Sequence, residues 1–546
     1  MRFVTVFVLA LSGSLFAGNA KIAGDVDQSA SGGPTKVIVQ YNSALTNAHH
    51  LKVQGLGGSL STPMSMIQGA SYSLPKSQLN TLANDPDVKY ISPDRRVGPT
   101  LDLARAAVNA NIANTSGYDG TGIGIALIDS GVSASPEFNK GGSNAVRIVY
   151  NESFTGGTTA DEYGHGTHVA GILGALGVYG DLHRFTGLAA GVNIVNLKVL
   201  DKNGAATDSQ VIAAIARAVA LKNTYNIRII NLSLGRGIGE SYKTDPLCQA
   251  VEAAWKAGIV VVAAAGNGGR TGYGTITSPG NDPYVITVGA MKTNGTQSRA
   301  DDTLASYSAK GPTAIDHIAK PDLVAPGNLI GSIRFAGGTL DTLYPANRIS
   351  PSYYLSTATS STASNYFRLS GTSMAAPVVS AAAALLLQQN PWLSPDLIKA
   401  RLMKTASKSF PSSSTTTDAT TGVTYTSYYD VFTVGAGYLD VWAALNNRSI
   451  WWGSAASPAT TYISATRKVS FVKASGVIWG SGVIWGSDAD SADFGVIWGS
   501  SVDGADDFGV IWGSDTSDAD FGVIWGSSAP AASNGLWATS TLVKGE

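Results

Sequence analysis

The sequence contains a single cysteine and few charged residues. Because Cys248 is alone, no disulfide can form within these 546 residues. The thiol has no neighbouring histidine and no C-x-x-C partner, so we expect it to be buried and structural. Charged residues make up 14% of the chain, and the formal net charge is −1. This balance gives no electrostatic basis for a nucleic acid or an anionic membrane as a partner.

Long hydrophobic runs are also absent. A short run at residues 3–11 follows Arg2 and precedes the small-x-small sequence Gly18-Asn19-Ala20. This arrangement is typical of a signal peptide over residues 1–20, and the run is too short to span a membrane. The other long apolar stretch, residues 381–387, is also too short and predicts a buried helix. We therefore expect a secreted, extracellular protein with no membrane span after signal removal.

Glycine and apolar residues, by contrast, are abundant, with 63 glycines and 44% apolar residues. Between residues 101 and 446, β-branched apolar runs alternate with helix-like stretches such as 211–221 and 246–257. The strand-like runs show little polar alternation, as in strands buried on both faces: 124–128, 192–197, 227–232, 259–263 and 285–288. This order predicts an α/β domain with a mostly parallel sheet. The polar stretch 332–367 is either a surface insertion or a flap beside the cleft.

Two flanking regions differ from this central domain. Residues 36–97 combine strand-like segments with one helix-like segment at 76–83, which predicts a small α+β domain. Residues 447–546 form a tail in which the unit Gly-Val-Ile-Trp-Gly begins at Gly476, Gly482, Gly495, Gly509 and Gly522. Residues 474–543 hold nine Asp and no Lys, Arg or Glu. We expect a β-rich tail of short strands joined by Asp/Ser turns. Calcium binding by the aspartates, carbohydrate or cell-surface contact through the tryptophans, and removal during maturation stay open.

Three short, widely separated segments each place one reactive residue among small side chains. They are Ala-Leu-Ile-Asp-Ser-Gly-Val with Asp129, Gly-His-Gly-Thr-His-Val-Ala-Gly with His165, and Gly-Thr-Ser-Met-Ala-Ala-Pro with Ser373. Acyl transfer by serine needs a hydroxyl that attacks, an imidazole that accepts its proton, and a carboxylate that orients the imidazole. The order Asp, His, Ser is the triad order of subtilisin. From about Lys36 to Asn446, the chain resembles the subtilisin-like serine proteases, or subtilases. His168, the second histidine of its motif, we expect to pack within a helix.

The resemblance implies a subtilisin-like three-layer α/β domain over residues 101–446 and serine endopeptidase activity. It implies that residues 36–97 are an inhibitor-type propeptide, and the likeness is strongest over residues 79–94. In the family the C-terminal residues of the propeptide lie in the active-site cleft until it is cut, here between Arg95 and Leu103. No cofactor is implied for catalysis. Structural Ca²⁺ is possible, but the sequence assigns no metal ligands.

Further residues match the machinery of this family. Ser373 precedes an Ala/Leu-rich run, so its hydroxyl should lie at a helix N-terminus, which favours negative charge. Asn267, in Ala-Ala-Ala-Gly-Asn, matches the subtilase oxyanion residue, although it could also be a turn residue after a strand. The segment Ser233-Leu234-Gly235 would pair with the substrate backbone, and Ala264-Ala265-Gly266 would line the pocket before the cut bond. Their small neutral side chains favour apolar or aromatic substrates.

We therefore predict a secreted serine endopeptidase made as an autoprocessed zymogen. Its partners would be protein and peptide substrates and its own propeptide as an intramolecular inhibitor. The alternative is a non-catalytic surface or adhesion protein that keeps a protease fold and acts through the Trp-rich tail. The enzyme is favoured because all four site positions, Asp129, His165, Ser373 and Asn267, are intact.

Overall fold

The structure is a computed structural model that divides into two compact units, residues 1–97 and 98–546. The residues that it describes are 21–23, 26, 34–93, 101–140, 145–359, 361–418, 421–450, 453–463, 468–472, 477–479, 483–485 and 536–537. The expected signal peptide, residues 1–20, lies outside them.

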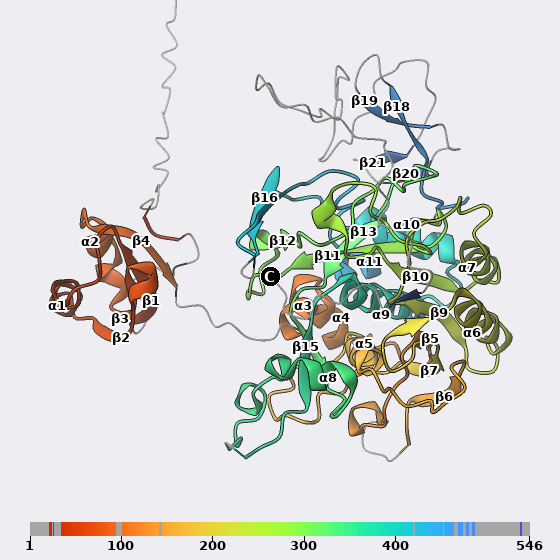
Figure 1. The fold of residues 1–546 in the computed structure, drawn as a ribbon, viewed down its shortest axis with the longest axis horizontal. Coiled ribbons are helices and arrows are strands. Elements are labelled where there is room, and N and C mark those ends of the chain that lie inside the picture. The colour runs from red at the N-terminus through yellow and green to blue at the C-terminus, as the bar shows by residue number, and fades with distance from the viewer. Residues whose placement is uncertain are drawn as a thin grey trace, which may run out of the picture. The chain divides into compact units, whose positions relative to one another are not determined.

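The N-terminal unit is an antiparallel sheet accompanied by two α-helices, α1 (Asn47–Gly55) and α2 (Leu79–Ala83) (Figure 1). Its strands lie in the order β2 (Ser59–Met64), β3 (Gly69–Leu74), β1 (Thr35–Tyr41) and β4 (Val88–Pro93). Short 3-10 turns precede β3 and α2, at η1 (Ser65–Ile67) and η2 (Lys76–Gln78). The unit encloses its own hydrophobic core.

The prediction of a single helix in this unit was wrong, and β2 was also missed. α1 carries no apolar stripe, because His49 and Val53 are its buried residues. β2 has no buried residue and lies at the edge of the sheet. Apolar periodicity reports burial, so elements that bury little give no signal.

The larger unit is built on an eight-stranded, mostly parallel sheet, as predicted. Seven strands follow the order β12-β11-β10-β9-β5-β7-β6, and β13 pairs with β11. Of these pairs only β11–β12 is antiparallel within the described residues. The bounds are β5 (Gly124–Asp129), β6 (Ile148–Ser153), β7 (Asn193–Lys198), β9 (Ile227–Leu232), β10 (Val260–Ala264), β11 (Ile286–Lys292), β12 (Thr303–Leu304) and β13 (Leu323–Pro326).

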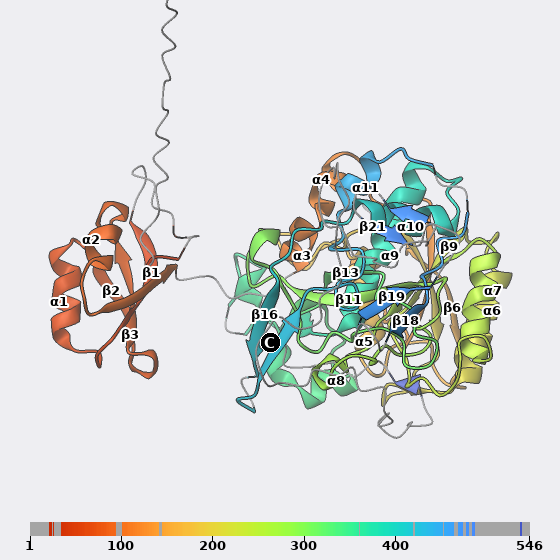
Figure 2. The same cartoon turned by 90° about the horizontal axis from the view of Figure 1, so that it is seen from above.

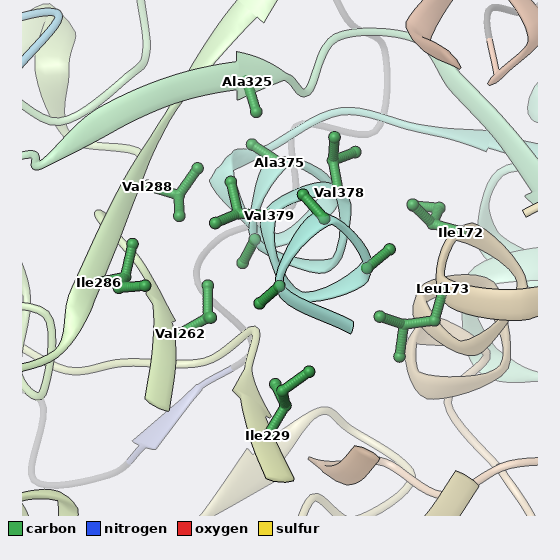
Figure 3. Packing of buried hydrophobic residues seen from close by; sticks show 14 of the residues in the cluster. Ile172, Leu173, Ile229, Val262, Ile286, Val288, Ala325, Ala375, Val378 and Val379 are labelled. Carbon is green, nitrogen blue, oxygen red and sulfur yellow. The ribbon is translucent and has the colours of Figure 1, made fainter. Parts of the chain in front are cut away.

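Helices cover both faces of this sheet and give three layers (Figures 1 and 2). α6 (Asp208–Ala220) and α7 (Pro246–Lys256) pack together on one face. α5 (His165–Gly174) and α9 (Thr372–Gln389) pack together on the other. Figure 3 shows Val378 and Val379 of α9 between side chains of the sheet and of α5. These contacts confirm the predicted three-layer α/β fold.

α9 is the one helix in the described part of the chain that is long and apolar enough to cross a membrane. Its 18-residue window is 89% buried. The helix therefore belongs to the core of the larger unit, as its alanine-rich sequence predicts.

The polar stretch at residues 332–367 leaves the domain between two paired strands. β14 (Ile330–Ile333) and β15 (Tyr366–Leu369) are antiparallel, and the intervening residues hold α8 (Thr339–Leu343), η6 (Pro345–Asn347) and η7 (Pro351–Tyr353). We call residues 334–365 the insertion.

The remaining elements are α3 (Leu101–Ala107), α4 (Ala110–Thr115), η3 (Pro136–Phe138), η4 (Gly269–Thr271), η5 (Arg299–Asp301), α10 (Pro395–Thr405), β16 (Ser413–Thr417), β17 (Thr424–Tyr428) and α11 (Val441–Asn446).

The strands in the described part of the tail form three short pieces of sheet, the third of them with a strand from outside the tail. β18 (Thr460–Ile463) pairs with β19 (Lys468–Phe471), and β20 (Val477–Trp479) pairs with β21 (Val483–Trp485). β20 and β21 are the Val-Ile-Trp residues of the first two Gly-Val-Ile-Trp-Gly units, and they pair in antiparallel fashion. The units at Gly495, Gly509 and Gly522 lie outside the described residues. The third piece, β22 (Leu536–Trp537), pairs with β8 (Ala205–Ala206).

Candidate active site

The three reactive residues stand at the ends of elements that the fold brings together. Asp129 is the last residue of the central strand β5, His165 is the first residue of α5, and Ser373 is the second residue of α9. α5 packs against both β5 and α9. All three side chains are buried, with relative exposures of 1%, 0% and 0%. The carboxyl ends of parallel strands are where open α/β sheets build sites.

Asp129 and His165 are in direct contact. Nδ1 of His165 lies 2.8 Å from Oδ1 of Asp129, and the backbone N–H of Ser130 donates to the same oxygen at 2.7 Å. Because a carboxylate only accepts hydrogen bonds, Nδ1 is the donor, and Nε2 is left as the basic atom. Within the described residues Nε2 has no hydrogen-bond partner. The imidazole is thus oriented by Asp129 and ready to accept a proton.

The charge of Asp129 also shifts the pKa of His165. Burial lowers the pKa of His165, but the charge and the hydrogen bond of Asp129 outweigh burial, and the net pKa is raised. A carboxylate beside an imidazole favours the imidazolium form in this way.

Glycine at position 166 allows this close approach. A Cβ atom there would lie 2.2 Å from the carbonyl oxygen of Gly131 and 3.1 Å from Oδ1 of Asp129. Any larger residue would push α5 away from the end of β5. The small neighbours of His165 in the sequence are therefore a packing requirement.

Asp161, which the sequence analysis did not single out, holds the loop that carries His165. It is fully buried, and its Oδ1 accepts hydrogen bonds from the hydroxyl of Ser130 (2.8 Å) and the N–H of Gly164 (2.7 Å). Its Oδ2 accepts from the N–H of Thr167 (2.8 Å). The signal in the sequence is weak, because one aspartate four residues before a histidine has many ordinary explanations.

Ser373 contacts the first of the predicted substrate-binding segments. Its hydroxyl donates to the carbonyl oxygen of Ser233 at 3.1 Å, and the hydroxyl of Ser233 donates to the carbonyl oxygen of Ser373 at 2.8 Å. Leu234 is fully buried. The segment that ends at Gly235 therefore begins directly beside the serine.

Asn267 also lies beside the start of α9. Its Oδ1 accepts hydrogen bonds from the backbone N–H of Thr372 (2.9 Å) and from the Thr372 hydroxyl (3.1 Å). A Cβ atom on Gly371 would lie 3.1 Å from Nδ2 of Asn267. The same Thr372 hydroxyl accepts from the N–H of Gly266 at 3.1 Å, which joins the segment Ala264–Gly266 to this corner. The oxygen of the amide is thus anchored, which fixes the direction of its nitrogen.

The insertion contacts the histidine loop. The N–H groups of Thr339 and Leu340 donate to the carbonyl oxygens of Glu162 (3.1 Å) and Tyr163 (3.0 Å), and the Thr339 hydroxyl donates to the carbonyl oxygen of Lys202 (2.7 Å). Of the two alternatives for this stretch, the contacts favour a segment beside the site over a remote surface insertion.

The other candidate residues have structural roles. Nε2 of the buried His168 lies 3.0 Å and 3.1 Å from the carbonyl oxygens of Ile330 and Phe367, and burial lowers its pKa to about 3. A neutral imidazole that donates to carbonyls is a packing residue. Cys248 is buried, and burial raises the pKa of its thiol, which confirms the expected structural thiol. No group of three or more His, Cys, Asp or Glu side chains suited to a metal occurs among the residues that the structure describes.

Comparisons with known proteins identify the family. A family model described as "Subtilase family" matches residues 120–429, more than half of the chain. Serine protease AprX of Bacillus subtilis (strain 168) is 35% identical over 351 residues, which cover 62% of this chain and 74% of that protein. Subtilisin DY of Bacillus licheniformis is 34% identical over 311 residues, 56% of this chain and 92% of that protein. Subtilisin E of Bacillus subtilis (strain 168) is 30% identical over 381 residues, 68% and 85% of the two chains. The chain therefore belongs to the subtilase family and is a subtilisin-like serine endopeptidase.

Proposed function

We propose that Asp129, His165 and Ser373 are the catalytic triad, and that the chain is a secreted zymogen that processes itself. The observation that carries the triad assignment is the 2.8 Å contact between Nδ1 of His165 and Oδ1 of Asp129. It leaves Nε2 as the only basic atom of the ring, beside the helix that carries Ser373. The triad order along the chain matches that of subtilisin.

The reaction follows from these positions. Oγ of Ser373 attacks the carbonyl carbon of the substrate while Nε2 of His165 takes its proton, and Asp129 stabilises the resulting imidazolium. Nε2 then returns the proton to the leaving amine, and water releases the acyl group by the reverse sequence. Since the Ser373 hydroxyl now donates to the carbonyl oxygen of Ser233, it must first rotate towards Nε2.

The oxyanion of the tetrahedral intermediate would be held by the N–H of Ser373 and by Nδ2 of Asn267. The first donor belongs to the first turn of α9, where backbone N–H groups lack helical partners. The second is fixed in direction because Thr372 holds Oδ1 of Asn267 through two hydrogen bonds. Preorganised donors of this kind cost no reorganisation during the reaction.

The substrate would lie along Ser233–Gly235 and place the side chain before the cut bond near Ala264–Gly266. Two nearby acids, Glu240 and Asp245, could have favoured basic substrates; Glu240 is exposed, and Asp245 is already paired. Asp245 is fully buried and accepts from Arg236 and from the hydroxyl of Ser278, both at 2.8 Å. This supports a preference for apolar or aromatic residues.

The N-terminal unit would act as the propeptide and intramolecular inhibitor, with residues 1–20 as the signal peptide. Its separate hydrophobic core supports folding as a unit of its own. Structural Ca²⁺ is proposed only because it is common in the family. Ligands would have to include backbone carbonyls, because no acidic cluster supplies them among the described residues.

The test compares the secreted protein with its Ser373→Ala variant by N-terminal sequencing and intact mass. We expect the wild type to begin between Arg95 and Leu103 and the variant to keep the propeptide. The matched control is Ser409→Ala, because Ser409 is an exposed serine far along the chain; it should mature like the wild type. If the variant matures normally, another protease cuts the chain and self-processing is refuted. If the wild type also fails to hydrolyse a denatured protein, the triad assignment falls.

A further inference from the structure

One strand pair connects the end of the tail to the larger unit. β22 lies antiparallel to β8, with Leu536 opposite Ala206 and Trp537 opposite Ala205. In Figure 1 β22 is the short dark-blue strand on the larger unit. Within the described residues β8 has no other strand partner. An edge strand of this kind offers unpaired backbone N–H and C=O groups, and here they meet a segment of the same chain.

β8 lies close to the proposed base. It follows β7, after which the N–H groups of Val199 and Leu200 donate to the carbonyl oxygen of Asp129 at 2.8 Å and 3.2 Å. A Cβ atom on Gly204, the residue before β8, would lie 2.7 Å from the ring of Tyr163. That ring is 6.4 Å from the imidazole of His165. The start of β8 is therefore one aromatic ring away from the base.

The far end of β8 is tied to the proposed substrate-binding segment. Asp208, two residues after β8, forms a two-pronged ion pair with Arg236, with Nη2–Oδ2 and Nε–Oδ1 distances of 2.9 Å and 3.0 Å. Arg236 directly follows Ser233–Gly235, which begins beside Ser373. β8 thus begins one aromatic ring away from His165, the segment begins beside Ser373, and one ion pair joins the residues that follow both. An extended peptide bound at β8 lies along the site.

We propose that an extended substrate would also lie against the edge of β8 and that β22 occupies this edge, so that the C-terminal segment of this chain competes with substrate. This inference rests on the proposed function of the site. Strand addition uses main-chain hydrogen bonds and accepts many sequences, so an uncharged strand such as Leu536–Trp537 can take the place of a substrate. A tethered segment acts at an effective concentration of about millimolar, enough to compete with a substrate of ordinary KM. The tail is then an inhibitory element in addition to the N-terminal unit.

The test uses the enzyme after loss of the N-terminal unit, with its tail verified by intact mass. Two variants remove the pairing: a chain that ends at Gly535, and Leu536→Pro with Trp537→Pro in the full-length tail, because proline cannot donate to a strand. We expect both to lower KM for a short peptide anilide about fivefold or more with unchanged kcat. The control is Ser527→Pro with Ser528→Pro, which puts the same number of prolines elsewhere in the same tail and should leave KM unchanged.

A second measurement covers the case in which the tail is lost or a variant fails to fold. A synthetic peptide of residues 530–546 is added to enzyme that lacks the tail. Competitive inhibition that disappears in the double-proline peptide supports the inference, and absence of inhibition overturns it. Labelling of Ser373 by a sulfonyl fluoride separates the two proposals. If the enzyme is labelled and active but KM does not change and the peptide does not inhibit, only the role of β22 is refuted. If the enzyme is neither labelled nor active, the proposed function itself is refuted.

Discussion

The ammonium group of Lys399 lies 3.0 Å from Oδ1 of Asp322, and both side chains are completely buried. Lys399 also donates to the carbonyl oxygens of Pro283 (2.8 Å) and Val285 (3.0 Å). A second buried lysine, Lys320, lies 2.7 Å from the other oxygen of Asp322. One carboxylate therefore sits between two ammonium groups, and it links α10 to the loop before β11 and to the start of β13.

Because Asp322 is the shared partner, Asp322→Asn should destabilise the protein more than Lys399→Met. The first change removes the carboxylate that both buried ammonium groups contact, while the second leaves the Lys320–Asp322 pair. Removing one partner of a buried pair costs about 3–5 kcal/mol. The free energy of unfolding is measured by urea denaturation and compared between variants that have equal m-values. The control is Lys404→Met, on the more exposed side of the same helix, which should change the free energy of unfolding by no more than about 0.5 kcal/mol. Equal losses in all three variants would contradict the central role of Asp322.

The raised pKa of His165 predicts where activity is lost on the acid side of the pH profile, the acid limb. In the proposed mechanism His165 accepts a proton only in its neutral form, so kcat/KM should rise with pH through an apparent pKa above the ordinary histidine value of about 6.5. In Asp129→Asn the raising charge is gone and burial, which lowers the pKa, remains. The limb should then move to lower pH, while kcat falls about 10⁴-fold as in other triads. Profiles of kcat/KM between pH 5 and 10 test this, and an unmoved limb would mean that another group controls it.

Asp161 should act as a positioning residue for the base. Asp161→Asn replaces one carboxylate oxygen, which accepts hydrogen bonds, with an NH₂ group, which donates them. This donor would face the N–H groups of the histidine loop. We expect stability to fall by about 1–3 kcal/mol and kcat to fall more than KM changes. Since the charge of Asp161 raises the pKa of His165, the acid limb should also move to lower pH. Asp301→Asn, at an exposed carboxylate that accepts from Thr296, is the matched control. A stability loss without any change in the pH profile would reduce Asp161 to a purely structural role.

Thr372 should support the oxyanion donor without touching substrate. Asn267→Ala should lower kcat about 10²–10³-fold with little change in KM, the loss found on removing this type of donor in subtilisin. Thr372→Val keeps the shape but loses the hydroxyl contact to Oδ1 of Asn267, so we expect a smaller loss in kcat. In the double variant the two losses should not add, because Thr372 acts through Asn267. Additive losses would show that Thr372 acts independently.

The sequence predicts the features that depend on dense apolar patterns or on motifs. The strands at Gly124–Asp129 and Ile227–Leu232 were expected within one residue of their bounds, since strands buried on both faces are continuously apolar. It cannot predict elements that bury little, such as α1, or pairings of two-residue strands such as β8 and β22. It also cannot predict Asp161, whose role arises from four hydrogen bonds to backbone and side-chain groups that come together only in the folded loop.

Within the insertion, one carboxylate accepts hydrogen bonds from two arginines and a backbone N–H group. Asp341 accepts from Arg334 at 2.6 Å and 2.7 Å, from Arg348 at 2.7 Å and from the N–H of Gly337 at 3.0 Å. Although burial alone would raise it, the pKa of Asp341 is lowered by the hydrogen bonds of these two arginines. Its contribution to stability is therefore present above the ordinary aspartate pKa of about 3.9 and is lost as the pH falls below it.

Asp341→Asn should loosen the insertion at neutral pH. Because α8 holds the loop before His165 through Thr339 and Leu340, we expect kcat/KM to fall several-fold, with faster cleavage of the insertion by a second protease. The variant should also lose less stability than the wild type when the pH is lowered from 6 to 3, since the carboxylate that titrates is absent. Asp181→Asn, an exposed carboxylate that accepts from the N–H of Ser356 within the same insertion, is the control. If only stability changes and kcat/KM does not, the contacts of α8 with the histidine loop do not support catalysis.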